Sequence, residues 1–371
     1  MKNFEELGIR KDYIKGLNEL GIINPTDIQR EVIPVLLKTN TDLVGQAQTG
    51  TGKTAAYGLP LLHKINPNKK YVQGLILCPT RELGQQIAKQ LFKFTKYSDK
   101  IFSEAVYGGA PIDKQIYALK RPTQIIVATP GRLIDLVKRK AVDLKYVKTI
   151  ILDEADEMLS MGFKKELDEI LSFTSRAENK WLFSATLPHG INQIINQHLS
   201  ANAHRIEVSG HNVVNKHIEH QCVICDENDK LNILMRFLRS EGENRGLIFC
   251  RTKVATQKLA KQLIAKNVAA DAIHGDLLQK ERDKVMRAFK KGTLKMLVAT
   301  DLAARGIDIE GLAYVVHYQL PDKDEYYTHR SGRTARAGKK GVSLSLVTSF
   351  DMKQIRYYEK SLSIVFNQVS I

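Results

Sequence analysis

Two short stretches of the sequence combine residue types whose spacing suits phosphate chemistry. The first is Ala47-Gln48-Thr49-Gly50-Thr51-Gly52-Lys53-Thr54, in which the glycines allow backbone N–H groups to curl around phosphates. A helix that begins at Lys53 would add the partial positive charge of its N-terminus. Lys53 would reach the β- and γ-phosphates, and the hydroxyl of Thr54 would be a ligand of Mg²⁺. The general motif begins with glycine, whereas this chain has Ala47 at that least informative position.

The second stretch is an apolar run that ends in carboxylates. Residues 150–152 have apolar neighbours on both faces, which predicts a buried parallel strand. Asp153, Glu154 and Asp156 follow at the carboxyl end of this strand, where open α/β sheets bind their ligands. Buried acidic groups are costly unless a cation meets them, and hydrated Mg²⁺ suits a carboxylate. The two stretches together predict a nucleoside-triphosphate site.

Two other predicted strands end in a hydroxyl and an arginine. Residues 75–78 lead into Pro79-Thr80-Arg81, and residues 125–128 lead into Thr129-Pro130-Gly131-Arg132. A helix N-terminus with Thr and Arg forms a phosphate clamp, and two clamps suit a nucleic-acid backbone rather than bases. Gly108-Gly109 would let another chain approach closely. Each motif alone also fits a capped turn, but the three together favour a groove for a nucleic-acid strand.

The second half of the chain repeats the alternation of strands and helices, which predicts a second parallel sheet. No second glycine-rich Lys-Thr loop occurs in its sequence. It carries instead His329-Arg330-Ser331-Gly332-Arg333-Thr334-Ala335-Arg336. On a helix, residues 329, 333 and 336 would share one face. Arg333 and Arg336 would then suit arginine fingers supplied across a cleft, and the alternative is a solvated basic face.

These motifs require an α/β fold with two sheets. The length of 371 residues suggests two or three domains. The strand pattern weakens after residue 208, so we predict a first domain at 1–208, a linker at 209–216 and a second domain at 217–371. Because the linker is short and polar, the two domains would stay close and could hinge.

A further candidate precedes the glycine-rich loop. Asn24-Pro25 predicts a turn, and Thr26 is placed to cap a helix that carries Ile28 and Val32. Gln29 could pair both of its amide groups with the N6/N7 edge of adenine. Taken alone, this segment also fits a capped surface helix.

Composition narrows the class of protein. Hydrophobic content of 43% and charged content of 26% fit a soluble globular protein, and no apolar run is long enough for a transmembrane helix. The first residues lack the apolar core of a signal peptide. With 56 basic and 40 acidic residues, the formal charge of +16 indicates binding to a polyanion, although a basic protein without such a partner is the alternative.

The four cysteines are few and unevenly spaced, so we expect a reducing, cytoplasmic location. Cys78 and Cys250 lie in apolar runs, as small buried hydrophobic residues do. The remaining two, with neighbouring histidines, suggest a zinc cluster at 217–225. That segment reads as a single strand, however, which would place 220 and 222 on one face and 217 and 225 on the other. One strand does not easily converge four ligands on a tetrahedral ion.

With these motifs assembled, the sequence resembles the DEAD-box RNA helicases of superfamily 2. Nearly the whole chain is covered, in the family's order, by segment 21–29 with Phe4 ahead of it, AQTGTGKT, PTREL, GG, TPGR, DEAD, SAT, the strand at 247–252, ATDLAARGIDI and HRSGRTARAG. Three positions depart from the commonest form: Gly84 stands for Ala, Ser331 for a hydrophobic residue and Ala335 for Gly. None of them removes a charge.

The resemblance implies two tandem RecA-like domains, each a mainly parallel sheet flanked by helices. It also implies that ATP with Mg²⁺ and single-stranded RNA bind in the interdomain cleft, and that ATP hydrolysis drives local RNA unwinding or remodelling of RNA–protein complexes. Among the implied nucleotide-site roles, Phe4 stacks on adenine, Asp153 holds Mg²⁺ through water and Glu154 orients the attacking water. Residues implied to contact the nucleotide are Phe4, Thr26, Gln29, Gln48, Thr49, Gly50, Thr51, Gly52, Lys53, Thr54, Gly306 and Asp308.

Other roles carried by the resemblance concern the transition state, coupling and RNA. Arg333 and Arg336 are the implied fingers, and His329 would take part in coupling hydrolysis to domain closure. Ser184, Thr186 and Asp156 would couple hydrolysis to domain closure. Residues implied to line the RNA path are Pro79, Thr80, Arg81, Gly109, Thr129, Arg132, Thr252, Gly275, Gln279, Arg282 and Thr300.

Rival functions remain open from the sequence. The phosphate clamps would not contact a 2′-hydroxyl, which is the group that distinguishes RNA from DNA. A DNA helicase of the same superfamily is therefore one alternative. An ATP-gated RNA clamp without turnover is another, although intact Glu154, Arg333 and Arg336 argue against it. A metabolic kinase with the same phosphate loop is disfavoured, because kinases need no second sheet with arginine fingers. The RNA that is recognised and any protein partners are not indicated.

Overall fold

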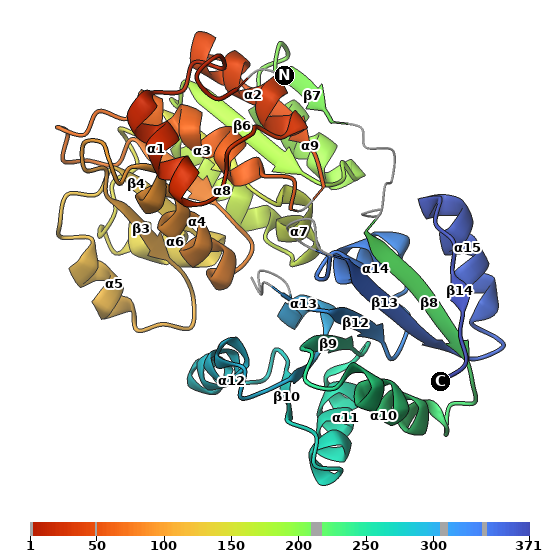
Figure 1. The fold of residues 1–371 in the computed structure, drawn as a ribbon. Helices are drawn as coiled ribbons and strands as arrows, with labels where there is room; N and C mark the ends of the chain where they lie inside the picture. Colours follow the sequence, from red (N-terminus) through yellow and green to blue (C-terminus); the bar gives the residue numbers. More distant parts are fainter. Residues whose placement is uncertain (1–2, 49, 209–216, 305–310, 336–339) are drawn as a thin grey trace. The chain divides into compact units, whose positions relative to one another are not determined.

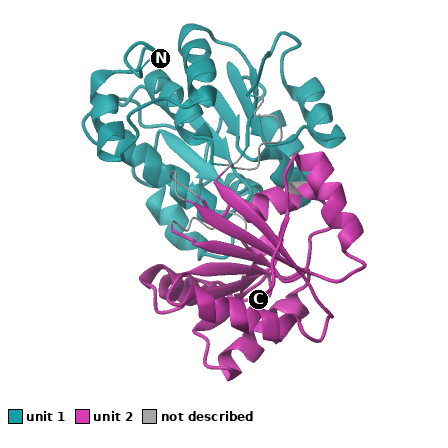
Figure 2. Cartoon of the chain, turned by 45° about the vertical axis from the view of Figure 1, so that its right-hand side comes forward, with its two compact units in different colours: residues 1–209 teal, residues 210–371 magenta. Residues whose placement is uncertain are grey.

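The chain forms two compact units, Met1–Ser209 and Gly210–Ile371 (Figure 2). The computed structural model describes residues 3–48, 50–208, 217–304, 311–335 and 340–371, and each unit is considered by itself. The division falls inside the predicted linker 209–216, whose residues lie outside the described part of the chain.

Unit 1 is built on a seven-stranded sheet with the order β3-β4-β2-β5-β6-β1-β7 (Figure 1). Every pair of neighbouring strands is parallel. The strands are β1 Leu43–Gln46, β2 Gly74–Leu77, β3 Ser103–Val106, β4 Ile125–Ala128, β5 Thr149–Leu152, β6 Asn179–Ser184 and β7 His204–Glu207. All four residues of β2, β4 and β5 are buried, which confirms the parallel strands predicted from the apolar runs.

Helices cover both faces of this sheet. They are α1 Lys11–Glu19, α2 Asp27–Lys38, α3 Lys53–Lys64, α4 Arg81–Phe94, α5 Ile112–Ala118, α6 Pro130–Lys138, α7 Ala155–Ser160, α8 Lys164–Phe173 and α9 His189–His198. The alternation of side chains along β5 divides the core: Ile151 packs in the cluster with α1 to α4, whereas Ile150 and Leu152 pack with α6 to α9. Cores on both faces fix the direction and register of β5, and therefore the place where Asp153 emerges.

Unit 2 repeats the topology of unit 1. Its sheet has the order β10-β11-β9-β12-β13-β8-β14, so subtracting seven from each label gives the order of the first sheet. All neighbours are again parallel. The strands are β8 Ile218–Ile224, β9 Gly246–Phe249, β10 Ala270–Ile273, β11 Met296–Ala299, β12 Tyr314–His317, β13 Gly341–Val347 and β14 Asn367–Gln368. The predicted second parallel sheet is therefore confirmed.

The helices of unit 2 also lie on both faces of their sheet. They are α10 Lys230–Glu241, α11 Lys253–Ala265, α12 Gln279–Lys291, α13 Asp301–Ala304, α14 Asp324–Ser331 and α15 Met352–Leu362. Strand β8 occupies the position that β1 occupies in unit 1, but a turn with three carboxylates, Asp226, Glu227 and Asp229, follows it. Unit 2 thus has an acidic turn at the position of the glycine-rich loop.

The four cysteines lie within β8 or directly after β2, β8 and β9. Cys78 and Cys250 are fully buried, as predicted. Residues 218–224 form one strand, with His220 and Cys222 buried and His217 exposed. His220 accepts or donates a 2.6 Å hydrogen bond through Nδ1 to the hydroxyl of Tyr327. Among the described residues, no helix has the length and apolar character needed to cross a membrane.

Candidate active site and nucleic-acid surface

Most predicted site residues of unit 1 lie along one edge of its sheet. Because all strands are parallel, their carboxyl ends meet at this edge. Residues predicted to bind RNA follow β3, β4 and β2, which are neighbours. The residues predicted to bind or sense the nucleotide follow β5, β6 and β1 in the adjoining half, except for Phe4, Thr26 and Gln29, which precede β1. The fold therefore sorts the two predicted functions into two halves of one edge.

The glycine-rich loop is folded back on itself. Gly50 and Gly52 have φ values of 83° and 89°, in the left-handed region that favours glycine. Lys53 is buried, and its Nζ donates a 2.6 Å hydrogen bond to the carbonyl of Ala47. An incoming phosphate would compete with that carbonyl for the ammonium group. Thr49 lies outside the described residues.

Gln29 connects the predicted adenine segment to this loop. Its Oε1 accepts a hydrogen bond of 3.0 Å from the backbone N–H of Thr26, and its Nε2 donates one of 3.0 Å to the carbonyl of Gly52. Thr26 precedes α2, as predicted for a helix cap. The φ of 89° at Gly52 favours glycine, and a Cβ there would lie 2.4 Å from Gln29 Nε2, so the Gln29 side chain would have to shift. Both amide groups of Gln29 are thus engaged within the protein, and adenine reading stays a prediction.

Phe4 is more deeply buried than a residue that stacks on a nucleotide would be. Only 2% of the residue is exposed, and it packs in the core cluster with α1 to α4. Stacking of Phe4 on adenine therefore also stays a prediction, one that requires a ring face to become accessible.

Asp153 emerges from β5 as a buried carboxylate whose two oxygens are both held. Its Oδ2 accepts a 2.8 Å hydrogen bond from the hydroxyl of Tyr57, and its Oδ1 accepts one of 3.0 Å from the backbone N–H of Glu154. Burial raises the pKa of Asp153, while the charge of Lys53 and the Tyr57 hydrogen bond act in the opposite direction. Thr54 and Asp153 supply the hydroxyl and carboxylate oxygens that Mg²⁺ prefers, and a divalent cation would offset the cost of burying this charge. The residues therefore fit a hydrated Mg²⁺.

Glu154 has an unusual backbone. Its φ of 51° and ψ of 52° place it in the left-handed region, immediately before α7. For a residue other than glycine, such a conformation costs about 1–2 kcal/mol and is found preferentially at functional sites. The turn from β5 into α7 is thus made at the residue predicted to orient the attacking water.

The three residues of unit 1 that are predicted to couple hydrolysis to closure are joined by hydrogen bonds. Asp156 Oδ2 accepts from both the backbone N–H and the hydroxyl of Thr186, each at 2.9 Å. The Ser184 hydroxyl donates to the Thr186 carbonyl at 2.7 Å and accepts from the Asp156 N–H at 3.2 Å. Movement of the segment after β6 would therefore act on the acidic stretch after β5. Their coupling role stays a prediction.

The RNA half of the unit 1 edge presents two arginines held in place. The guanidinium of Arg81 lies 4.7 Å from the ring centre of Tyr107. Arg132 Nη2 donates to the carbonyl of Ala110 at 3.0 Å, while its Nη1 is buried and has no hydrogen-bond partner within the described part of the protein. The hydroxyl of Thr80 caps α4 by accepting from the Leu83 N–H. The Nη1 group of Arg132 is thus suited to donate a hydrogen bond to an oxygen of a bound anion.

The same half-edge of unit 2 carries the other predicted RNA residues. Thr252 follows β9, Gly275 follows β10 and Thr300 follows β11, and these three strands are neighbours. Thr252 caps α11 by accepting from the Ala255 N–H at 3.1 Å. On α12, Gln279 donates to Asp283 and Arg282 donates to the carbonyl of Ala303, both at 2.9 Å. The second sheet therefore brings these residues to one edge as well.

The arginine-rich segment corrects one prediction. Helix α14 ends at Ser331, so Arg333 lies in the following turn and does not continue a helical face with His329. Gly332 is the first residue after the helix. The Thr334 hydroxyl then donates to the carbonyls of Leu312 and Ala313, which holds the chain next to β12. His329 and Arg333 nevertheless line one small recess with Asp301 and Phe249. Arg336, Gly306 and Asp308 lie outside the described residues.

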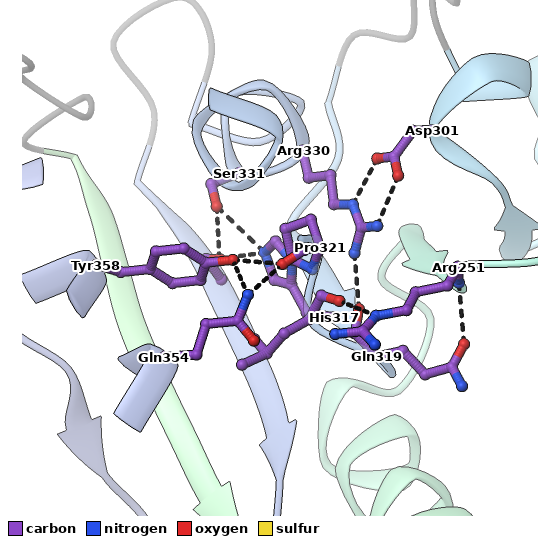
Figure 3. A network of polar contacts seen from close by, with 11 residues as sticks. Arg251, Asp301, His317, Gln319, Pro321, Arg330, Ser331, Gln354 and Tyr358 are labelled. Atoms are coloured by element: carbon purple, nitrogen blue, oxygen red, sulfur yellow. Dashed lines mark hydrogen bonds and ion pairs between the residues drawn. The ribbon is translucent and has the colours of Figure 1, made fainter. Parts of the chain in front are cut away.

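Arg330 was assigned no role from the sequence, yet among the described residues of this segment it is the most deeply buried charge. It is 1% exposed and pairs in a bidentate manner with Asp301, with N–O distances of 2.6 and 2.7 Å (Figure 3). Its Nη1 donates to the carbonyl of Gln319 at 2.7 Å, and its guanidinium lies over the Phe249 ring. The available sequence signal was the i, i+3, i+4 spacing of Tyr327, Arg330 and Ser331, which puts Arg330 on the buried face of α14.

Ser331 belongs to a buried polar network, also visible in Figure 3. Its hydroxyl lies 2.9 Å from the hydroxyl of Ser343 and 3.2 Å from Nε2 of His317. Ser343 in turn contacts the Tyr327 hydroxyl at 3.3 Å. The departure from a hydrophobic residue at 331 is therefore matched by polar partners on β12 and β13.

Taken together, these features define a class of protein: two RecA-like α/β units of one topology, of which the first carries a phosphate loop and an acidic strand end. Residues 26–194 match the DEAD/DEAH box helicase family, and residues 229–338 match the helicase conserved C-terminal domain. The chain belongs to the DEAD-box ATP-dependent RNA helicases.

Individual relatives agree with this assignment. The chain is 41% identical to the DEAD-box ATP-dependent RNA helicase CshA of Bacillus cereus, over 97% of this chain and 68% of that protein. The structure of S. cerevisiae Dbp5 bound to RNA and ADP BeF3 is 31% identical with a TM-score of 0.90, over 100% of this chain and 96% of that one. That of Mss116p bound to ssRNA and AMP-PNP is 27% identical with a TM-score of 0.87, over 99% and 79%. The predicted family, tandem RecA-like fold and helicase activity are confirmed.

Proposed function

We propose that Mg·ATP and single-stranded RNA bind in a cleft between the two units, and that closure around both ligands couples ATP hydrolysis to local duplex unwinding or to remodelling of RNA–protein complexes. The observation that carries this proposal is that the predicted site residues are divided in the same way along the carboxyl-end edge of each sheet. In each unit, predicted RNA residues follow three neighbouring strands. Predicted nucleotide residues follow the adjoining strands in unit 1, and Arg333 follows β12, the strand next to β9, in unit 2. Complexes of Dbp5 and Mss116p with RNA and a nucleotide support it.

Unit 1 would supply the nucleotide site. Lys53 leaves the Ala47 carbonyl to bind the β- and γ-phosphates, and Thr54 and Asp153 hold Mg²⁺, which neutralises phosphate charge when bound. Glu154 orients the water that attacks the γ-phosphate. Because Asp153 is buried and fixed at both oxygens, the acidic strand end is organised before ligands arrive.

Unit 2 would complete this site. Arg333 and Arg336 stabilise the charge that develops on the transferred phosphoryl group, an effect worth about 10³-fold or more in rate. His329 lies beside Arg333 in the recess next to Asp301 and transmits closure. Asp308 and Gly306 contact the nucleotide. Neither unit then has a full set of catalytic groups alone.

RNA would be held along its backbone by both units. Arg81, Arg132 and Arg282 supply positive charge, and the threonines at strand ends supply hydroxyls that orient the strand. ATP and RNA each contact both units in this arrangement, so each favours closure and thereby the binding of the other. We further propose that residues 1–208 and 217–371 act as two domains joined by 209–216, and that the protein works in the cytoplasm.

The ATPase rate with and without RNA tests the proposal. Single-stranded RNA is expected to raise the rate strongly, and an equal length of DNA to compete poorly for this stimulation. Release of a short RNA duplex, measured in the same reaction, separates an unwinding enzyme from a static RNA clamp. Equal ATPase rates with and without RNA would contradict the proposed coupling.

A further inference from the structure

Tyr57 is a fully buried residue whose hydroxyl points at the acidic strand end. It lies on α3, one turn after Lys53, and donates the 2.8 Å hydrogen bond to Oδ2 of Asp153. Its ring packs against Phe183, with ring centres 5.2 Å apart. The ring is therefore fixed by apolar contacts, and the hydroxyl is fixed by a carboxylate on another element.

Tyr57 lies on the same helix as Thr54, three residues further along, so the two side chains share one face of α3. The hydrogen bond from the Tyr57 hydroxyl to Asp153 therefore links the helix that carries Thr54 to the strand end that carries Asp153.

The hydroxyl is not needed to fill space. A phenyl ring would keep the contact with Phe183, whereas a buried hydroxyl is unfavourable unless it is hydrogen-bonded. What the hydroxyl adds is an anchor for a carboxylate oxygen that would otherwise be buried without this donor. Because Oδ1 is already held by the Glu154 N–H, the Tyr57 contact removes the remaining freedom of the Asp153 side chain.

We propose that Tyr57 is a positioning residue for the metal–nucleotide site: from the helix that carries Thr54, its hydroxyl holds the Asp153 carboxylate in the orientation that receives hydrated Mg²⁺. This inference rests on the proposed function, in which Thr54 and Asp153 hold the ion. Groups that orient metal ligands commonly change metal affinity by about 10–100-fold when they are removed. Tyr57 acts through Asp153 and not on the phosphates.

Tyr57→Phe removes only the hydroxyl and tests this role. Mn²⁺ is titrated into the ADP-saturated protein, and free Mn²⁺ is measured by EPR with ADP alone as the baseline. We expect the Mn²⁺ concentration for half-saturation to rise about tenfold. The affinity for fluorescent ADP in EDTA is expected to stay unchanged, since the phosphate loop is intact.

Tyr13→Phe is the matched control. Tyr13 is also buried in unit 1, and its hydroxyl donates to the carbonyl of Leu62 at 3.3 Å. It should leave the Mn²⁺ titration unchanged, and thermal melting followed by Trp181 fluorescence reports any loss of fold in either variant. Unchanged Mn²⁺ affinity in Tyr57→Phe, or an equal loss in Tyr13→Phe, would overturn the proposal. Failure of the unaltered protein to bind Mn·ADP would refute the proposed function instead.

Discussion

At the scale of single residues, the acidic strand end concentrates the constraints of the site. Asp153 is buried and held at both oxygens, and Glu154 adopts a left-handed backbone directly after it. Such a conformation persists only where the surroundings determine it strongly, because it is intrinsically unfavourable. The geometry at these two residues is therefore set by the fold before any ligand binds.

Replacement of Glu154 by Gln keeps the shape of the side chain and removes its ability to act as a base. We expect ATP binding to persist and RNA-stimulated hydrolysis to fall at least about a hundredfold, the range seen for loss of a general base. Fluorescent-nucleotide binding and phosphate release measure the two effects separately. Near-normal turnover of this variant would remove Glu154 from its proposed role.

Arg132 offers a test of the RNA surface at the same scale. Its buried Nη1 has no partner in the described part of the chain, so a phosphate oxygen would satisfy it. Arg132→Ala is expected to weaken binding of single-stranded RNA for all sequences alike. The slope of log affinity against log salt concentration should become shallower by about 0.7, as for one lost phosphate contact.

Arg139, at the end of the same helix, is the control for this measurement. It is exposed and pairs with Asp135 at 2.8 Å. Arg139→Ala should leave the salt slope unchanged, and a similar change in both variants would show that general charge, not the Arg132 contact, decides RNA affinity.

At the scale of elements, helix α14 is anchored by a buried ion pair. Arg330 is 1% exposed and bonds both oxygens of Asp301, the first residue of α13. Loss of one partner from a buried pair leaves an uncompensated charge. The orientation of α14, and with it the position of His329, therefore depends on Asp301.

Asp301→Asn is expected to destabilise unit 2 by about 3 kcal/mol or more. Chemical denaturation followed by circular dichroism measures this, with Trp181 fluorescence reporting on unit 1 alone. Asp322→Asn is the matched control, because Asp322 is exposed and its nearest contact to Arg251 is 3.4 Å. That exposed pair should contribute at most about 1 kcal/mol, and equal effects would argue against the anchoring role.

The polar network between β8, β12 and β13 predicts a dependence of stability on pH. Burial lowers the pKa of His220 to about 4 and lowers that of His317 as well. Since protonation is easier in the unfolded chain, the stabilising contribution is present above about pH 6.5 and is lost as the pH falls towards 4. For His220 alone, the loss amounts to roughly 3 kcal/mol.

Denaturation curves between pH 7 and pH 4 check this expectation. His220→Gln should remove part of the pH dependence of unit 2 and keep a polar group beside the Tyr327 hydroxyl. His204→Gln, at an exposed position of β7, should leave the profile as it is. A His220→Gln profile identical to that of the unaltered protein would contradict the assignment.

Elements and motifs could be predicted from the sequence where the residues that define them are consecutive in the chain. The apolar runs of β2, β4 and β5 and the loop before Lys53 are local patterns, and the structure confirms them. The end of α14 was predicted wrongly, because it depends on the contact of Thr334 with the distant carbonyls of Leu312 and Ala313. The Tyr57–Asp153 and Arg330–Asp301 contacts were not foreseen for the same reason: each joins segments that are far apart in sequence.

At the scale of the whole molecule, two units of one topology carry complementary residues. If closure requires both ligands, then a non-hydrolysable ATP analogue with Mg²⁺ should raise the affinity for single-stranded RNA, typically by about 5–150-fold. RNA should raise the affinity for the analogue by the same factor, because the coupling is reciprocal. Fluorescence titrations in both orders measure the two factors, and unequal factors would show that a different equilibrium is being observed.

The acidic turn at Asp226, Glu227 and Asp229 stands in unit 2 where the phosphate loop stands in unit 1. Glu227 pairs with Lys230 at 2.7 Å, and Asp226 and Asp229 add further negative charge at this position. Because this turn disfavours a triphosphate, we expect the nucleotide to bind unit 1 alone, with one nucleotide per protein molecule and each catalytic cycle beginning on that unit.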